Sequence, residues 1–205
     1  MTDLMMLVTH FGATVLLAPF SLLVAAWLWR AVGWREALLW CGCVAGVGIV
    51  TGLAKIYLQL CGLHLHGVHS PSGHTAFSAI AYGGFTVIAM SGSRSLRANL
   101  FRVGIALWVL LIGYSRVVVE AHSPNEVIVG LVIGGASVAV FAALYRGRVR
   151  PPYLLAGSIL LAVALVALLV IPDQVFTLEN WLHRIAHQLV PYRGSLCPAP
   201  PVTAA

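Results

Sequence analysis

Charged residues are scarce in this chain of 205 residues. They make up 9% of the sequence, with six acidic residues in total, while 60% of the residues are hydrophobic. Soluble globular domains carry about 25% charged residues. This shortage excludes an ordinary soluble domain and indicates a protein that lies in a membrane.

The sequence also lacks internal repeats and a polar region large enough for a second domain. Hydrophobic runs follow one another instead, and about 20 apolar residues cross the hydrocarbon core of a bilayer as a helix. The first run follows "MTD" rather than a basic stretch and is too long for a cleavable signal peptide. We therefore predict an all-α, integral membrane bundle of six transmembrane helices within residues 1–171. Its spans are Leu4–Trp29, Ala37–Leu60, Thr75–Met90, Val103–Val119, Val127–Tyr145 and Tyr153–Ile171.

Cysteine is rare as well, with four residues in the chain. Cys41 and Cys43 fall inside the second predicted span, where a structural disulfide is not expected. Cys61 and Cys197 could meet on one side of the membrane. Small buried residues are nevertheless the plainer interpretation of all four.

The positive charges are distributed unevenly, and this predicts an orientation. Three predicted loops, those after the first, third and fifth spans, hold 8 of the 12 Lys and Arg residues. Basic loops stay on the cytoplasmic side, so we predict that both termini lie outside. The net charge of +6 is then a topology signal rather than a nucleic-acid-binding surface. The basic loop residues are Arg30, Arg35, Arg94, Arg97, Arg102, Arg146, Arg148 and Arg150.

Two polar segments, "HSPSGHT" (His69–Thr75) and "SRVVVEAHSPNE" (Ser115–Glu126), share the predicted outer face. In the first, a helix start leaves backbone N–H groups and a positive dipole end for an anion. Gly73 lets the backbone approach a ligand closely, and Ser72 adds a hydroxyl or serves only as a helix cap. A cap explains Ser72 well but leaves His74 unexplained.

The second segment carries a cation and an imidazole. Arg116 presents a planar fork suited to bidentate phosphate binding, and His122 can act as a base or nucleophile near neutral pH. Glu126 can hold the imidazole, or it can close a capping box with Ser123, and one carboxylate can fill both roles. Glu120 is either a second acid or a solvated group, and we favour the solvated group.

The chain contains a single lysine, Lys55, near the outer end of the second predicted span. A lone cation in a membrane helix usually faces a partner or a wet cavity. The alternative is a lysine that snorkels to the membrane interface.

Together these residues resemble the type-2 phosphatidic acid phosphatase, or lipid phosphate phosphatase, superfamily. Its three sequence blocks are K-x6-RP, PSGH and SR-x5-H-x3-D, and the resemblance covers roughly Lys55–Tyr145. "PSGH" at Pro71–His74 matches fully, and the third block matches in its Ser, Arg and His. Two departures stand out: Gly62-Leu63 occupies the place of Arg-Pro, and Glu126 replaces the final Asp. Family members also commonly have two spans before the lysine-bearing span, whereas one precedes it here.

The resemblance implies a phosphatase of the cytoplasmic (inner) membrane that hydrolyses lipid phosphates or diphosphates at the extracytoplasmic face. His122 would form a phosphohistidine, Glu126 would orient its ring and His74 would protonate the leaving group. The phosphate-binding groups would be Lys55, Ser72, Gly73 and Arg116. No metal or cofactor is expected, and the expected partners are the lipid substrate and the bilayer, with no nucleic acid.

Two alternatives stay open at the level of sequence. The same histidine could pass phosphate to a second lipid, which would make the protein a phosphotransferase. The missing Arg-Pro could instead leave a catalytically weakened lipid-binding relative, unless His64, His66 or His69 replaces the lost cation. A six-helix haem protein is disfavoured because the histidines lie in loops.

Residues 172–205 form a predicted extracytoplasmic tail. Apolar residues recur there at helical spacing, with polar residues opposite, which predicts an amphipathic helix on the outer membrane surface. It is either a passive anchor or a gate for lipid, and the passive anchor is the simpler interpretation. The apolar positions are Leu178, Trp181, Leu182, Ile185 and Leu189.

Overall fold

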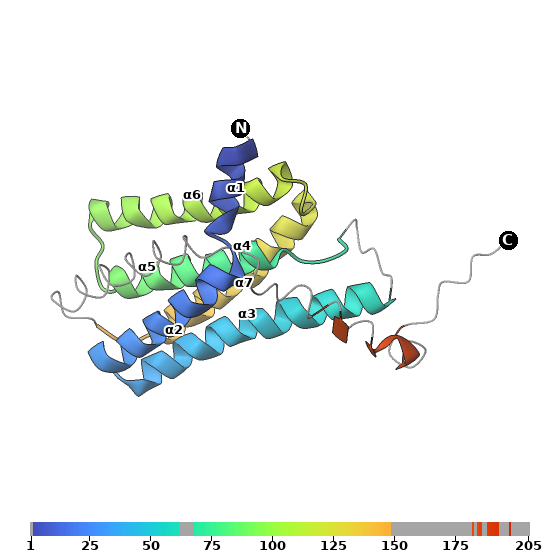
Figure 1. The fold of residues 1–205 in the computed structure, drawn as a ribbon. Helices are drawn as coiled ribbons and strands as arrows, with labels where there is room; N and C mark the ends of the chain where they lie inside the picture. The colour runs from blue at the N-terminus through green and yellow to red at the C-terminus, as the bar shows by residue number, and fades with distance from the viewer. Residues whose placement is uncertain are drawn as a thin grey trace, which may run out of the picture.

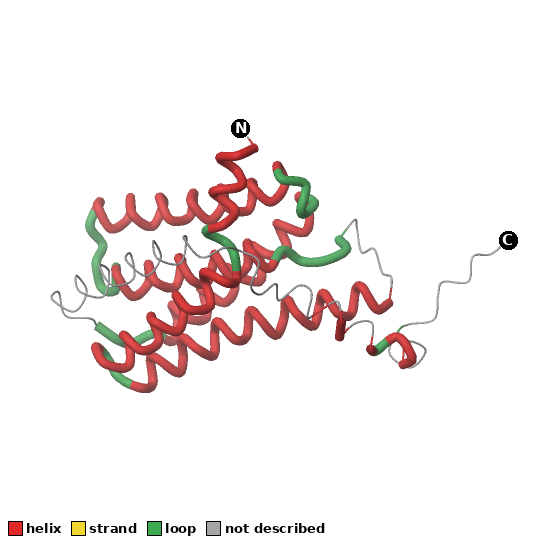
Figure 2. Tube along the Cα trace, viewed as in Figure 1, coloured by secondary structure: helices red, strands yellow, loops and turns green. Residues whose placement is uncertain are grey.

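The computed structural model describes residues 2–61 and 68–148, together with residues 182, 184–185, 188–192 and 197 of the tail. The elements within these ranges are all helical (Figures 1 and 2). They are α1 (Thr2–His10), α2 (Thr14–Ala31), α3 (Trp34–Cys61), α4 (Gly73–Ser78), the π-helical turn η1 (Ala79–Gly83), α5 (Gly84–Ala89), α6 (Leu96–Val118), α7 (Pro124–Leu144) and the 3-10 turn η3 (Val190–Tyr192).

Four helical stretches are long and apolar enough to cross a membrane: Asp3–Ala31, Trp34–Cys61, Leu96–Val118 and Pro124–Leu144. They correspond to four of the predicted spans. The third predicted span forms the shorter continuous run α4–η1–α5. The predicted span Tyr153–Ile171 lies outside the described residues. The all-α class is thus confirmed for the described residues, with four candidate membrane spans, whereas a count of six spans is not shown.

The first predicted span is not one straight helix, because the chain turns between His10 and Thr14. Gly12 at this corner packs so closely that an added Cβ would lie 2.7 Å from Ile112 Cγ2 on α6. Figure 1 shows the result: α1 runs in a different direction from α2 and lies beside α6. Hydropathy predicts the apolar length of this segment but carries no signal for the turn.

The core lies where α2, α3, the α4–α5 run and α7 meet. Trp40 is fully buried, donates from Nε1 to the Ser21 carbonyl at 2.9 Å and meets Phe141 edge-on. Gly84 leaves room for this indole, since a Cβ there would lie 2.7 Å from Trp40 Cζ3. The large ring therefore joins α3 to the shorter central run and to α7.

Two glycines of α7 bring it against the backbone that precedes and begins α4. A Cβ on Gly130 would lie 2.6 Å from the Ser72 carbonyl oxygen, and one on Gly134 would lie 2.5 Å from the Ala76 carbonyl oxygen. Small residues four apart allow such close helix contacts in membranes. The packing fixes the Ser72–Ala76 backbone relative to the start of α7.

The antiparallel order of the helices separates two ends of the bundle (Figure 1). The turns after α2, α5 and α7, which have arginines in them or on the adjoining helix ends, lie at one end. The segment before α4 and the turn between α6 and α7 lie at the other end. The "PSGH" and "SRVVVEAH" segments therefore lie at the same end of the bundle, as the charge pattern predicts.

A disulfide ties the tail to this second end of the bundle. Cys61, the last residue of α3, bonds to Cys197, and their Cα atoms are 5.4 Å apart. The sequence left this pairing open and favoured small buried cysteines, so the bond corrects that interpretation. Within the predicted tail helix, residues 182, 184, 185 and 188 are helical, and Leu189 lies in the turn that follows. The other positions of that helix lie outside the described residues.

The glycine packing gives a direct prediction for stability. Gly134→Ala should lower the free energy of unfolding by about 1–3 kcal/mol, because its methyl group has no room against Ala76. Gly135→Ala is the matched control, since a Cβ at Gly135 meets no atom within 4 Å. It should be neutral or stabilising by up to about 1 kcal/mol. Thermal unfolding in detergent measures both, and equal melting temperatures would contradict the packing.

Candidate active site

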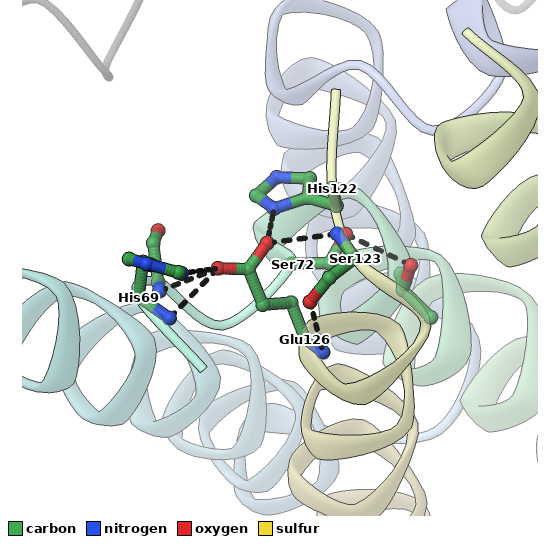
Figure 3. A network of polar contacts seen from close by, with 7 residues as sticks. His69, Ser72, His122, Ser123 and Glu126 are labelled. Atoms are coloured by element: carbon green, nitrogen blue, oxygen red, sulfur yellow. Dashed lines mark hydrogen bonds and ion pairs between the residues drawn. The ribbon is translucent and has the colours of Figure 1, made fainter. Parts of the chain in front are cut away.

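One carboxylate connects the two polar segments. Glu126 Oε1 accepts hydrogen bonds from the backbone N–H groups of His69 and Ser70, at 2.9 and 2.8 Å. Its Oε2 accepts from the backbone N–H of Ser123 at 3.0 Å and lies 2.9 Å from His122 Nδ1 (Figure 3). Glu126 is only 6% exposed. Because the three backbone groups can only donate, the site is built for an ionised carboxylate.

The local sequence explains why Glu126 lies there. Ser123 is the N-cap of α7, Pro124 occupies the first helical position, and the Ser123 hydroxyl accepts from the Glu126 N–H at 3.4 Å. With the return bond from Ser123 N–H, this is a capping box. The two roles considered for Glu126, helix cap and imidazole partner, are both present in one side chain.

The turn that ends α6 fixes the spacing between Arg116 and His122. The Arg116 carbonyl accepts from the N–H groups of Ala121 and His122, at 3.0 and 3.2 Å, and Glu120 N–H bonds to the Val117 carbonyl. This is the bonding pattern of a Schellman turn. Glu120 adopts the left-handed conformation with φ of 57° and is exposed, which agrees with a solvated group.

The PSGH segment binds the main chain of the same residue, Glu126. Ser72 N–H donates to the Glu126 main-chain carbonyl at 3.0 Å. The Ser72 side chain is fully buried, and its hydroxyl pairs with the Thr75 hydroxyl at 2.9 Å. Ser72 thus occupies the N-cap position of α4, but its oxygen makes no capping bond to the helix backbone.

A cavity of about 720 Å³ lies beside this network. Its polar wall contains Lys55, Gly73, His74 and Arg116. Lys55 is 6% exposed, which favours the cavity-facing interpretation over a snorkelling lysine. The remaining wall is largely apolar and comes from α1, α2, α3, α4 and the tail; it includes Met6, Ala13, Val15, Ala45, Ile49, Phe77 and Leu182.

The surroundings of His122 favour its neutral imidazole form. Its side chain is 6% exposed, and this burial lowers the pKa of His122 below the ordinary value of 6.5. The positive charges of Lys55 and Arg116 lower this pKa further, whereas the hydrogen bond to Glu126 acts in the opposite direction. Because the ionised Glu126 can only accept, Nδ1 carries the proton and Nε2 carries the lone pair. The ring can therefore act as a nucleophile.

Four of the predicted site residues, Lys55, Gly73, His74 and Arg116, line one cavity. His122 and Glu126 form a pair outside that lining, and the charges of Lys55 and Arg116 lower the pKa of His122. The Ser72 hydroxyl faces Thr75 instead. Among the described residues, no group of three or more His, Cys, Asp and Glu side chains could hold a metal ion.

Sequence reasoning missed two parts of the site. Thr9 Oγ1 accepts a hydrogen bond of 3.0 Å from Arg116 Nη1, although Thr9 lies in the first apolar run and carried no motif signal. The backbone of His69 and Ser70 binds Glu126, while the His69 side chain is 61% exposed. His64 and His66 lie outside the described residues.

Comparisons with known proteins place these features in a family. The PAP2 superfamily model matches residues 61–150. An uncharacterized 22.5 kDa protein in the cps region of Klebsiella pneumoniae is 30% identical over 154 residues, 71% of each chain. Phosphatidylglycerophosphatase B of Haemophilus influenzae is 41% identical over 85 residues, 40% of this chain and 34% of its own.

Lipid A 1-phosphatase of Rhizobium etli is 35% identical over 75 residues, which cover 36% of this chain and 32% of that enzyme. This chain therefore spans about a third of the length of the two named phosphatases. No solved structure matches the chain.

Glu126→Gln should reduce kcat/KM by about a hundredfold or more. The new amide NH₂ would face N–H donors in either orientation. Facing His122 and Ser123 it would deprive the ring of its acceptor, and facing His69 and Ser70 it would displace the backbone that holds the side chain, so the ring would lose its fixed orientation. Steady-state kinetics on a lipid phosphate measures the loss. Activity equal to that of the wild type would reduce Glu126 to a helix cap.

The acid limb of kcat/KM should have its midpoint below pH 6.5. The pKa of His122 is lowered in the folded protein, so the nucleophilic form persists until the pH falls through that lowered value. Lys55→Met should move the midpoint upward, because the charge that it removes lowers this pKa. Rates measured from about pH 4.5 to 8 test both directions. A midpoint above 6.5 in the wild type would contradict the assigned electrostatics.

Proposed function

Because the chain belongs to the PAP2 superfamily, we propose that it is a membrane phosphatase that hydrolyses lipid phosphates or diphosphates through a phosphohistidine at His122. The observation that carries this proposal is the His122–Glu126 pair, with 2.9 Å between Nδ1 and Oε2, beside a cavity lined by Lys55, His74 and Arg116. Phosphoryl transfer needs positioning and positive charge more than covalent assistance. Both are present.

In the first step, His122 Nε2 attacks phosphorus in line with the leaving oxygen. The N–P bond forms as the P–O bond breaks, and His74 gives a proton to the departing oxygen. Lys55 and Arg116, with the Gly73 N–H, stabilise the charge on the equatorial oxygens. The Ser72 hydroxyl would have to turn from Thr75 toward the phosphate to contribute.

In the second step, water attacks phosphorus and the N–P bond breaks. His74, now neutral, takes the proton from this water. The imidazole of His122 leaves with its Nδ1–H still hydrogen-bonded to Glu126. Inorganic phosphate is released, and the two histidines regain their starting protonation. The cycle needs no metal or cofactor.

The lining of the cavity supports a lipid substrate. Lys55, His74 and Arg116 share the cavity with a largely apolar wall from α2 and α3, both of which belong to candidate membrane spans. A volume of about 720 Å³ lies within the usual range for ligand pockets, about 300–1,000 Å³. Two relatives are named as phosphatases of lipid phosphates, namely phosphatidylglycerophosphate and lipid A.

Two features support an extracytoplasmic site in the cytoplasmic membrane. The arginines of the three basic turns lie at the end of the bundle opposite His122, and basic loops stay inside. The Cys61–Cys197 disulfide lies at the same end as the site, and disulfides persist in oxidising compartments.

We expect the detergent-purified protein to release phosphate from long-chain lipid mono- or diphosphates in the presence of EDTA. Its His122→Ala variant should lose the activity by about a thousandfold or more. A water-soluble phosphate monoester without a chain should react much more slowly, because it leaves the apolar wall unused. A panel of these substrates, assayed with and without EDTA, gives the measurement.

Three results would contradict parts of this proposal. Release by His122→Ala at the wild-type rate would exclude the phosphohistidine. Activity lost in EDTA and restored by a divalent cation would exclude the metal-free mechanism. Release that requires an added lipid alcohol, with phosphate found on that lipid, would favour the phosphotransferase.

A further inference from the structure

The guanidinium of Arg116 is held by the N-terminal helix α1, far from it in sequence. Arg116 lies in the last turn of α6, and its Nη1 donates a hydrogen bond of 3.0 Å to Thr9 Oγ1. Thr9 is 6% exposed. We propose that Thr9 is a positioning residue for Arg116 and that α1 belongs to the phosphate-binding site. This inference rests on the proposed function, in which Arg116 binds the substrate phosphate.

The corner between α1 and α2 fixes where Thr9 lies. The Tyr82 hydroxyl donates to the Phe11 carbonyl at 2.8 Å, which ties the corner to the turn η1. Gly12 lies so close to α6 that a Cβ would be 2.7 Å from Ile112 Cγ2. These contacts hold α1 against α6, so Thr9 meets the side chain of Arg116 rather than the lipid.

Thr9 lies at the wall of the cavity that would hold the phosphate. Thr9 and its neighbour His10 line the same cavity as Lys55, His74 and Arg116. The hydrogen bond to Arg116 therefore forms at the surface that the substrate would contact. An anchor at this place sets the direction of the guanidinium before substrate arrives.

A hydroxyl is well suited to this task. Arginine has a long side chain whose rotamer freedom must be lost before it can bind phosphate in one geometry. A hydroxyl oxygen can accept an N–H bond and carries no charge. It orients the guanidinium without neutralising it, whereas a carboxylate at the same place would compete with the phosphate for the positive charge.

The test uses inorganic phosphate as the probe and the full-length protein in detergent. Isothermal titration calorimetry should show that Thr9→Val weakens phosphate binding by about tenfold or more, since it deletes a hydrogen bond to a charged group. Thr9→Ser keeps the hydroxyl and should bind within about twofold of the wild type. The melting temperature of each variant without phosphate reports whether it has folded.

Thr86→Val is a matched control. Thr86 is also a buried threonine, 5% exposed, but its hydroxyl donates to the Tyr82 carbonyl on its own helical run. The same chemical change there should leave the phosphate dissociation constant unchanged. Weakening by Thr86→Val equal to that by Thr9→Val would show a general packing effect and overturn the inference.

A double-mutant cycle separates positioning from structural support. Arg116→Ala should weaken phosphate binding, and adding Thr9→Val to it should cause no further loss. A further loss of the same size in that background would overturn the role assigned to Thr9.

The remaining outcomes distinguish the two proposals. If Arg116→Ala weakens binding while Thr9→Val binds like the wild type, the inference about Thr9 fails and the proposed function stands. If the wild type binds no phosphate, or Arg116→Ala binds it equally well, both fail together.

Discussion

The structure of the site depends on the hydrogen bonds that the Glu126 carboxylate accepts. Three backbone N–H groups and His122 Nδ1 converge on it, from the segment before α4 and from the start of α7. Removing this one acceptor would leave four part-buried donors without their partner at once. One ionised side chain therefore joins the two polar segments at this end of the bundle, caps α7 and sets the tautomer of His122.

The rest of the bundle brings these donors within reach of one carboxylate. Gly130 and Gly134 let α7 lie on the backbone of Ser72 and Ala76, which places the PSGH segment beside the first turn of α7. The Schellman turn at Glu120 then returns the chain from Arg116 to His122 within hydrogen-bonding distance of Glu126. Packing in the apolar interior of the bundle thus positions the polar side chains at one of its ends.

Much of this site could be predicted from sequence, because the relevant signals are local or follow from topology. The basic loops placed His74 and His122 on one side, and the capping box of α7 is visible in "SPNE". The parts that could not be predicted depend on tertiary contacts. Hydropathy carries no sign of the corner at Gly12, so the bond from Arg116 to Thr9 was missed, and composition alone leaves the pairing of Cys61 and Cys197 open.

The most direct test of the central claim is to trap the phosphorylated enzyme. Wild-type protein would be mixed with a phosphate-labelled lipid substrate, quenched at alkaline pH to preserve a phosphoramidate, and digested for mass spectrometry. The account predicts phosphate on His122, at a greatly reduced level in Glu126→Gln and absent in His122→Ala. Turnover in which no phosphate reaches His122, or phosphate found on His74 instead, would contradict it.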